Sequence, residues 1–395
     1  MSYSEKYPIR QERLIDGFLE MIAIDSVSGH EASYRDYLQA RFDELGFAGV
    51  EDDAGQRLGG DSGNLLFKLP GTMNRPPLLL SAHMDTVVPG HNIKGELAQL
   101  DGHQIIRSAG PTILGGDDKA GVAALLEAIR VIIENRMDYP PLEILFTVSE
   151  EQGLLGIKNF DFSQIGAPIG FVLDSGGDPG TIVVQSPCQN EIEYRVRGIA
   201  AHAGMNPEEG RNAIQIMGRA LAKMPCGRID PDTTCNFGVI EGGLARNIVA
   251  PFCRVKGEAR SLDRSKLDKL TEELGSIFTA EVIANGGEPE VEVVLLYPEA
   301  ALQAEEEVVQ LALRAAENIG VAPRLESTGG GSDASIINDA GIRCANLGIG
   351  MKKVHTIDEY IRVEDLIADT AWIISIIRQA ADGYTWRLDP AGSSL

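Results

Sequence analysis

Five short segments of this chain carry the kinds of side chain that bind divalent metal ions in proteins. Two of the segments contribute the histidines His83 and His355, and the other three contribute carboxylates. The segments are SAHMDTV (81–87), GGDDKAG (115–121), TVSEEQG (147–153), VLDSGG (172–177) and VHTID (354–358). Imidazole and carboxylate donors without cysteine suit a catalytic pair of zinc ions, with cobalt or manganese as substitutes. The set predicts metal-assisted hydrolysis.

The first two segments supply His83, the nearby Asp85 and a carboxylate that could bind both metal ions. Because residues two apart on an extended chain point the same way, Asp85 is placed to accept a hydrogen bond from the ring nitrogen of His83 that is not on the metal. Asp117 and Asp118 follow a double glycine and open a helix, where acids also serve as ordinary helix caps. A carboxylate bridges two cations through its two oxygens. We assign the bridge to Asp117 and keep Asp118 as the alternative.

The remaining candidates divide into ligands and a base. Two adjacent glutamates at the end of a buried strand repel each other without cations nearby, so Glu150 and Glu151 favour a cation site, with a solvated loop tip as the alternative. We assign Glu151 to the metal and Glu150 to proton transfer from the attacking water. Asp174 follows the next apolar run, with a turn-forming aspartate as the alternative, and His355 lies in a polar loop where a surface histidine is the ordinary interpretation.

The elements around these segments predict an α/β sheet. The first two elements are helices, and Ser28 with Glu31 is the pattern of a capping box that opens the second of them. A long helix over 118–135 then separates apolar runs that resemble strands buried in a parallel sheet. These runs are 64–69, 77–81, 142–148 and 169–173. Because ligands usually bind at the carboxyl edge of such a sheet, the acidic and imidazole groups that follow the strands are expected to meet there.

The pattern changes near Cys188 and returns near Glu305. Residues 191–197 alternate polar and apolar side chains, which favours an antiparallel sheet with one solvated face. We therefore expect an α/β catalytic domain with a mostly parallel central sheet, formed by residues 1–188 and 299–395. An α+β domain is expected to be inserted as residues 189–298.

Composition limits the possible functions. The 395 residues suffice for two domains, and 44% of them are hydrophobic. A net charge of −23 disfavours nucleic acid and anionic membranes as partners. The five cysteines form no C-x-x-C pair, and no apolar stretch of about 18 residues occurs, so we expect reduced thiols, no membrane span and a cytoplasmic location.

Taken together, the motifs H-x-D, D-D-K-A-G, E-E-x-G, D-x-G-G and a late histidine resemble those of the M20 metallopeptidase family, in particular its peptidase T (tripeptide aminopeptidase) branch. The resemblance covers nearly the whole chain and implies a zinc-exopeptidase fold. It implies one zinc ion on His83, Asp117 and Asp174 and a second on Asp117, Glu151 and His355. It further implies Glu150 as the general base, Asp85 as the residue that orients His83, and a cis peptide bond after Asp117.

The same resemblance makes the inserted domain a lid that closes over substrate and forms a homodimer contact. His202 matches a lid histidine that stabilises the carbonyl oxygen as it becomes anionic, and Arg260 matches an arginine that binds a substrate carboxylate. A surface histidine and a surface ion pair are the respective alternatives. Asn247 is a weaker lid candidate. Gly330 and Gly331 lie in a Gly-Gly-Gly-Ser-Asp loop whose amides approach substrate in the family, where threonine replaces Ser332.

The implied activity is release of the N-terminal residue from short peptides. Its nearest alternative is an amidohydrolase of the same family acting as a dipeptidase, carboxypeptidase or N-acyl amino acid deacylase. A metal-binding protein without catalysis is the remaining alternative, and retention of Glu150 argues against it, because such a protein has no need of a base.

Overall fold

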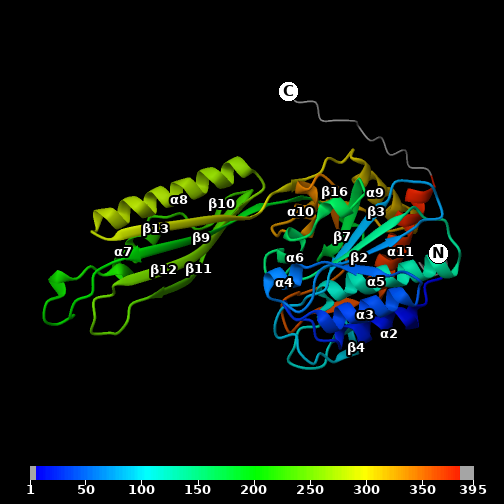
Figure 1. Cartoon of the computed structure of the whole chain (residues 1–395), viewed down its shortest axis with the longest axis horizontal. Coiled ribbons are helices and arrows are strands. Elements are labelled where there is room, and N and C mark those ends of the chain that lie inside the picture. The colour runs from blue at the N-terminus through cyan, green and yellow to red at the C-terminus, as the bar shows by residue number, and fades with distance from the viewer. Residues whose placement is uncertain (1–5, 383–395) are drawn as a thin grey trace. The chain divides into compact units, whose positions relative to one another are not determined.

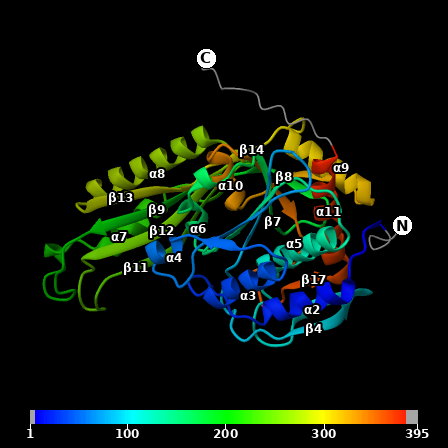
Figure 2. The ribbon, with the colours of Figure 1, turned by 45° about the vertical axis from the view of Figure 1, so that its right-hand side comes forward.

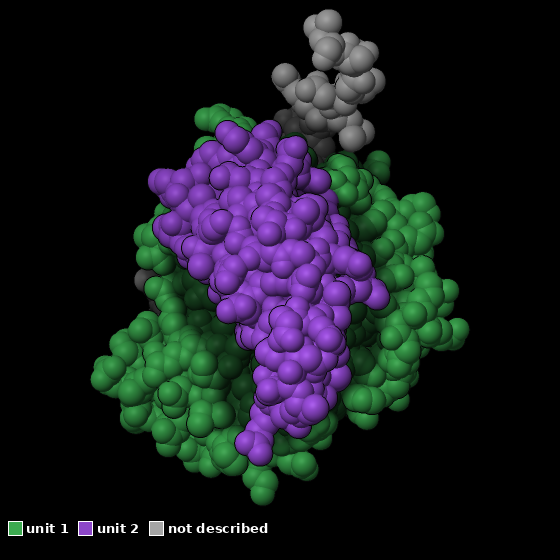
Figure 3. Space-filling model, turned by 90° about the vertical axis from the view of Figure 1, so that its left-hand side faces the viewer, with its two compact units in different colours: residues 1–184, 301–327, 332–395 green, residues 185–300, 328–331 purple. Residues whose placement is uncertain are grey.

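The computed structural model describes residues 6–382, which form two compact units (Figure 3). Unit 1 comprises Met1–Val184, Ala301–Ser327 and Ser332–Leu395. Unit 2 comprises Gln185–Ala300 and Thr328–Gly331. The chain therefore leaves unit 1 within the sixth strand of its large sheet, builds unit 2, and returns.

Unit 1 is built on a nine-stranded sheet with the order β1-β2-β6-β3-β7-β16-β8-β14, in which β15 also pairs with β8 (Figure 1). Strands β6, β3, β7 and β16 at its centre run parallel, whereas β1, β2 and β8 are antiparallel to their neighbours. All residues of β3 and β6 are buried, which explains their apolar sequences. The strands are β1 Gly49–Glu51, β2 Leu65–Leu69, β3 Leu78–His83, β6 Leu142–Thr147, β7 Ile169–Ser175, β8 Thr181–Ser186, β14 Ala300–Ala301, β15 Arg324–Ser327 and β16 Arg343–Gly348.

Helices cover this sheet and form one continuous hydrophobic core with it. Helix α5 packs on β3 and β7, and α11 contacts both α5 and α9. Helices α2 and α5 lie side by side in Figures 1 and 2. The helices are α2 Gln11–Ile22, α3 Ala32–Asp43, α4 Ala54–Leu58, α5 Gly116–Glu134, α6 Leu155–Lys158, α9 Glu307–Ile319, α10 Asp333–Asp339 and α11 Val363–Ala381, with a short 3-10 turn η1 at Phe162–Gln164. None of the helices within residues 6–382 has the length and apolar character needed to cross a membrane.

A small three-stranded sheet stands beside the large one, with the order β17-β5-β4. Its last strand begins directly after Glu359, and the backbone of Tyr360 is bridged to Lys352. This sheet therefore fixes both ends of the loop that carries His355. The strands are β4 Gly95–Leu100, β5 His103–Ser108 and β17 Tyr360–Arg362.

Unit 2 is an antiparallel sheet with the order β10-β11-β12-β9-β13, on which α7 and α8 pack. Ile192, Tyr194 and Val196 of β9 are buried in its core. The residues between them are partly exposed, and those at the two ends of the run, Glu191 and Arg197, are exposed. The predicted alternation is confirmed, as is the fold class. The elements are β9 Cys188–Arg197, η2 Pro207–Glu209, α7 Ala213–Leu221, β10 Gly227–Asp230, β11 Thr233–Gly242, β12 Phe252–Ser261, α8 Arg264–Ala284 and β13 Glu288–Tyr297.

The predicted capping box at Ser28 and Glu31 is wrong. Helix α3 begins after Glu31, whose own side chain does not cap it, and the first N–H of the helix, that of Ala32, is accepted by Asp61 (3.0 Å). The Ser28 hydroxyl donates instead to the carboxylate of Asp85 (2.6 Å), and Glu31 accepts the backbone N–H of Ser149 (3.1 Å). Both side chains are turned toward the buried end of the sheet, where a carboxylate and a backbone amide need partners.

Candidate metal centre

The predicted ligands of unit 1 meet at the carboxyl edge of its parallel strands. His83 is the last residue of β3, and its register partner Thr147 ends β6 just before Glu150 and Glu151. Asp174 lies near the end of β7, the other neighbour of β3. Because these strands are parallel and adjacent, their ends deliver the side chains to one place.

Asp117 stands between the two histidines. Its Oδ1 lies 3.0 Å from Nε2 of His83, and its Oδ2 lies 3.2 Å from Nε2 of His355. Each carboxylate oxygen thus faces a different imidazole, which is the arrangement a bridging ligand requires. Asp118 is fully buried, and its Oδ2 accepts the backbone N–H of His83 at 3.2 Å. The peptide bond that joins the two aspartates is cis.

The other two carboxylates complete a set on each side of Asp117. Oδ1 of Asp174 lies 3.7 Å from Nε2 of His83, and Oε1 of Glu151 lies 2.8 Å from Nε2 of His355. Donor atoms of His83, Asp117 and Glu151 all lie within 4.8 Å of one another, and so do those of His83, Asp118 and Asp174. A crowded set of imidazole nitrogens and carboxylate oxygens without sulfur fits a pair of divalent cations such as zinc.

The pKa values of the carboxylates in the cluster reflect their burial and the negative charge around them. Burial, and after it the negative charge of Asp174, raises the pKa of Glu150 well above its ordinary value. Burial likewise raises the pKa of Asp174 to about 7. Burial also acts to raise the pKa of Asp117, but hydrogen bonds with His355 and His83 outweigh it and hold that pKa below its ordinary value. The centre is acidic and suited to cations.

Asp85 connects the first histidine segment to the glutamate segment. Its Oδ1 accepts the backbone N–H of Glu150 (2.9 Å), and its Oδ2 accepts that of Glu151 (3.2 Å) as well as the Ser28 hydroxyl. We expected this carboxylate to accept from the His83 ring, but Nδ1 of His83 lies nearer to the backbone carbonyl of Asp85 (2.9 Å) than to its Oδ1 (3.4 Å). A carbonyl only accepts, so Nδ1 carries a proton, and the electron pair of Nε2 is available to a metal ion when one is bound.

His355 reaches the cluster from a loop with unusual backbone. Its φ is 63°, in the left-handed region that residues other than glycine rarely adopt, and Ser149 just before Glu150 has a φ of 50°. Such conformations persist only where the surrounding structure enforces them, and they gather at functional sites. Two of the five segments are therefore held in conformations that local sequence does not favour.

Comparisons with known proteins agree with this geometry. The model of Peptidase family M20/M25/M40 matches residues 79–379, which is more than half of the chain. The chain belongs to peptidase family M20. It is a metallopeptidase, and its sheet and inserted domain are those of the family.

Several relatives of this M20 peptidase are similar over nearly their whole length. The uncharacterised protein YqjE of Bacillus subtilis is 40% identical, over 94% of this chain and 100% of its own. The crystal structure of aminopeptidase PepT from Bacillus cereus is 42% identical with a TM-score of 0.86, over 94% of this chain and 99% of that one. A tripeptidase structure from Staphylococcus aureus is 37% identical with a TM-score of 0.90, at the same coverage.

The sequence does not predict the roles of two buried glutamates of the M20 peptidase, since it does not single out Glu359 and assigns Glu31 to a helix cap. Glu359 accepts three backbone N–H groups of the segment that leads to Asp117. Glu31 accepts both the backbone N–H and the hydroxyl of Ser149. The only feature of the sequence that could have pointed to Glu359 is its position directly after the segment VHTID.

The predicted lid residues all lie in unit 2. Nδ1 of His202 accepts the backbone N–H groups of Gly204 (3.2 Å) and Met205 (3.1 Å). Arg260 makes two hydrogen bonds of 3.0 Å to the carboxylate of Glu258. The backbone carbonyl of Asn247 accepts from Ala203.

The glycine loop of unit 2 packs on Tyr297. A Cβ at Gly331 would stand 2.4 Å from the Tyr297 ring, so only glycine fits there, and the Gly331 N–H donates to the Tyr297 hydroxyl (3.1 Å). The N–H of Gly330 donates to the hydroxyl of Thr328. The substrate roles predicted for the lid residues and these glycines stay predictions.

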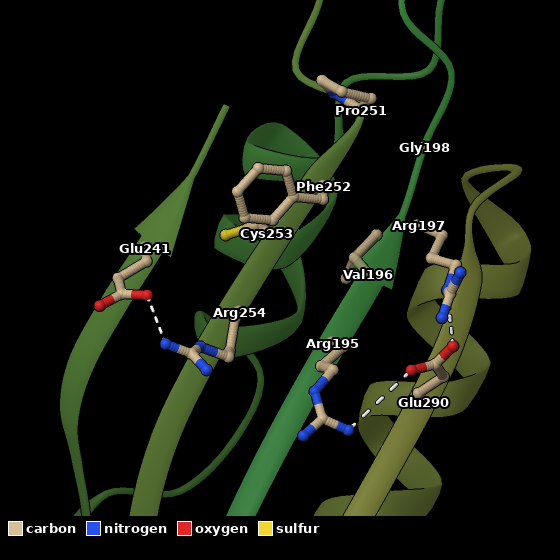
Figure 4. Close-up of a pocket in the computed structure, with 10 residues that line it drawn as sticks. All are labelled: Arg195, Val196, Arg197, Gly198, Glu241, Pro251, Phe252, Cys253, Arg254 and Glu290. Atoms are coloured by element: carbon tan, nitrogen blue, oxygen red, sulfur yellow. Dashed lines mark hydrogen bonds and ion pairs between the residues drawn. The ribbon is translucent and has the colours of Figure 1, made fainter. Parts of the chain in front are cut away.

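A surface pocket of unit 2 is lined by charged residues of its sheet (Figure 4). Arg197 pairs with Glu290 (2.6 Å), and Arg254 pairs with Glu241 (2.5 Å). Arg195 also reaches Glu290 at 4.0 Å. Because each of these arginines is paired with a glutamate, the pocket does not offer a set of metal-binding side chains like the one in unit 1.

Proposed function

We propose that this M20 peptidase is a dinuclear zinc exopeptidase that releases the N-terminal residue of short peptides. The observation that carries the proposal is Asp117, whose two carboxylate oxygens face His83 and His355 separately. One zinc ion would be held by His83, Asp117 and Asp174. The other would be held by Asp117, Glu151 and His355.

The residues around these ligands supply the proton chemistry. When bound, the two zinc ions polarise the scissile carbonyl and lower the pKa of water. Glu150 takes the proton of the attacking water and passes it to the leaving amine. Glu150 as a residue is only 9% exposed, and Asp85 accepts its backbone N–H, so the base is held next to the proposed ligand Glu151 in a buried position.

The substrate class is supported by relatives. The two solved structures at 42% and 37% identity are named as an aminopeptidase and a tripeptidase, and both match along almost their full length. We extend this activity to the present chain. In this proposal His202, Asn247, Arg260, Gly330 and Gly331 contribute to substrate binding from unit 2, which also forms the contact of a homodimer.

A panel of small substrates tests the proposal. It contains a tripeptide with a free N-terminus, the same peptide N-acetylated, a dipeptide and an N-acyl amino acid, each offered to zinc-loaded and to chelated protein. We expect zinc-dependent cleavage of the free tripeptide alone. Cleavage of the blocked substrates or the dipeptide instead would establish the amidohydrolase alternative, and absence of cleavage with zinc bound would establish the non-catalytic one.

A further inference from the structure

Both oxygens of the Glu359 carboxylate accept hydrogen bonds from the backbone of residues 114–117. Its Oε2 accepts the N–H groups of Leu114 (2.8 Å) and Gly115 (2.9 Å), and its Oε1 accepts the N–H of Asp117 (3.0 Å). The residue is 1% exposed. A Cβ at Gly116 would lie 3.0 Å from the same Oε1, so the segment wraps closely around the carboxylate.

Glu359 is itself anchored on the loop of the second histidine. It follows His355 by four residues, and the bridge between Lys352 and Tyr360 closes this loop just beyond it. Strand β17, which begins at Tyr360, pairs with β5. A single buried side chain therefore joins the loop that presents His355 to the segment that presents Asp117.

We propose that Glu359 is a positioning residue that sets the placement of Asp117 against His355, an inference that rests on the two-zinc function proposed above. The hydrogen bond to the N–H of Asp117 acts on the ligand residue itself. Since the oxygens of Asp117 must face two different imidazoles, a small rotation of its backbone takes one oxygen away from its partner. Supporting groups of this kind typically change metal affinity by about 10- to 100-fold when they are lost.

The chain offers a matched control for a merely structural role. Glu143 on β6 is also buried, at 5% exposure, and its carboxylate accepts the backbone N–H groups of Gly166 and Ala167, both at 2.9 Å. None of its partners is a metal-centre residue. Glu359→Gln and Glu143→Gln both replace one accepting oxygen by an amide that only donates.

The experiment is calorimetric titration of zinc into the metal-free full-length chain, with thermal unfolding of the same metal-free samples. We expect Glu359→Gln to weaken zinc binding by about 10- to 100-fold, and Glu143→Gln to lower the unfolding temperature while it leaves zinc affinity unchanged. Unaltered affinity in Glu359→Gln, or an equal loss in Glu143→Gln, would overturn the inference.

Two further outcomes are informative. If unsubstituted protein binds fewer than two zinc ions, the proposed function fails and this inference fails with it. If Glu359→Gln does not fold, Glu359→Asp keeps the charge and shortens the reach, and unaltered zinc affinity in that variant would overturn the inference while the two-zinc function stands.

Discussion

Replacement of Asp85 by asparagine tests how the backbone of Glu150, the proposed general base, is held. Oδ1 of Asp85 accepts from the backbone of Glu150 and Oδ2 from that of Glu151, so both oxygens are needed as acceptors. An asparagine keeps one oxygen and substitutes a donor for the other. Whichever way its amide turns, one of the two backbone N–H groups loses its acceptor.

The cost follows from the kind of hydrogen bond that is lost. A hydrogen bond to a charged group contributes about 1.5–3 kcal/mol. If this energy is lost from the transition state, kcat falls by about 10- to 200-fold, at 1.36 kcal/mol for each factor of ten. Zinc content is expected to stay the same in protein loaded with excess zinc, because all the proposed ligands are retained. Zinc affinity is expected to fall where the Glu151 N–H loses its acceptor, as it is for Glu359.

The assay is steady-state hydrolysis of a free-amine tripeptide by zinc-loaded protein, with metal analysis of the same samples. Ser28→Ala is the matched control, because it removes the third donor to Asp85 and leaves both backbone contacts intact. Its kcat is expected to change far less. A kcat within about twofold of normal in Asp85→Asn, or an equal loss in Ser28→Ala, would refute this reasoning.

Three other outcomes are expected. Glu150→Ala keeps its zinc but loses at least about 100-fold in rate, and near-normal turnover would remove Glu150 as the base. His83→Ala and Asp117→Ala each lower bound zinc in metal analysis after dialysis, and unchanged stoichiometry in both would exclude the two-zinc centre. Asp369 of α11 is fully buried, neither of its oxygens has a hydrogen-bond partner among the described residues, and burial raises its pKa well above the ordinary value. The folded state therefore binds this proton more tightly than the unfolded state, and stability is lost as pH rises. Asp369→Asn is expected to raise the unfolding temperature at about pH 8 and to change it little near pH 4, and equal shifts at both would contradict this sign.

The sequence predicted the site well where metal-binding side chain types follow apolar runs that form strands. His83, Glu151 and Asp174 stand at or just beyond the ends of apolar runs, and adjacent parallel strands must bring such ends to one edge of the sheet. Side-chain type then restricts the chemistry to cations. The fold class and the family follow from the same pattern, extended by the alternating strands of the inserted domain.

Sequence reasoning assigned the wrong hydrogen-bond partners to polar side chains that have several possible acceptors and donors in the folded chain. Ser28 and Glu31 match a helix cap, which is a pattern of local spacing. Ser28 donates instead to Asp85, and Glu31 accepts from Ser149 as well as from the nearby N–H of Gly29. The sequence cannot weigh a local cap against a buried acceptor that arrives from elsewhere in the chain.

Sequence alone predicted which residues could bind metal and which of them follow strands, because both predictions depend on residue type and local periodicity. Only the tertiary structure decided how these residues are held. Each oxygen of Asp117 faces a different histidine, and the carboxylate of Asp85 accepts from the backbone of Glu150. Glu359 accepts the backbone N–H of Gly115, which lies 244 residues earlier in the chain. The physical reason is that a buried carboxylate must satisfy its oxygens with whatever donors folding brings near, and those donors are set by packing rather than by spacing.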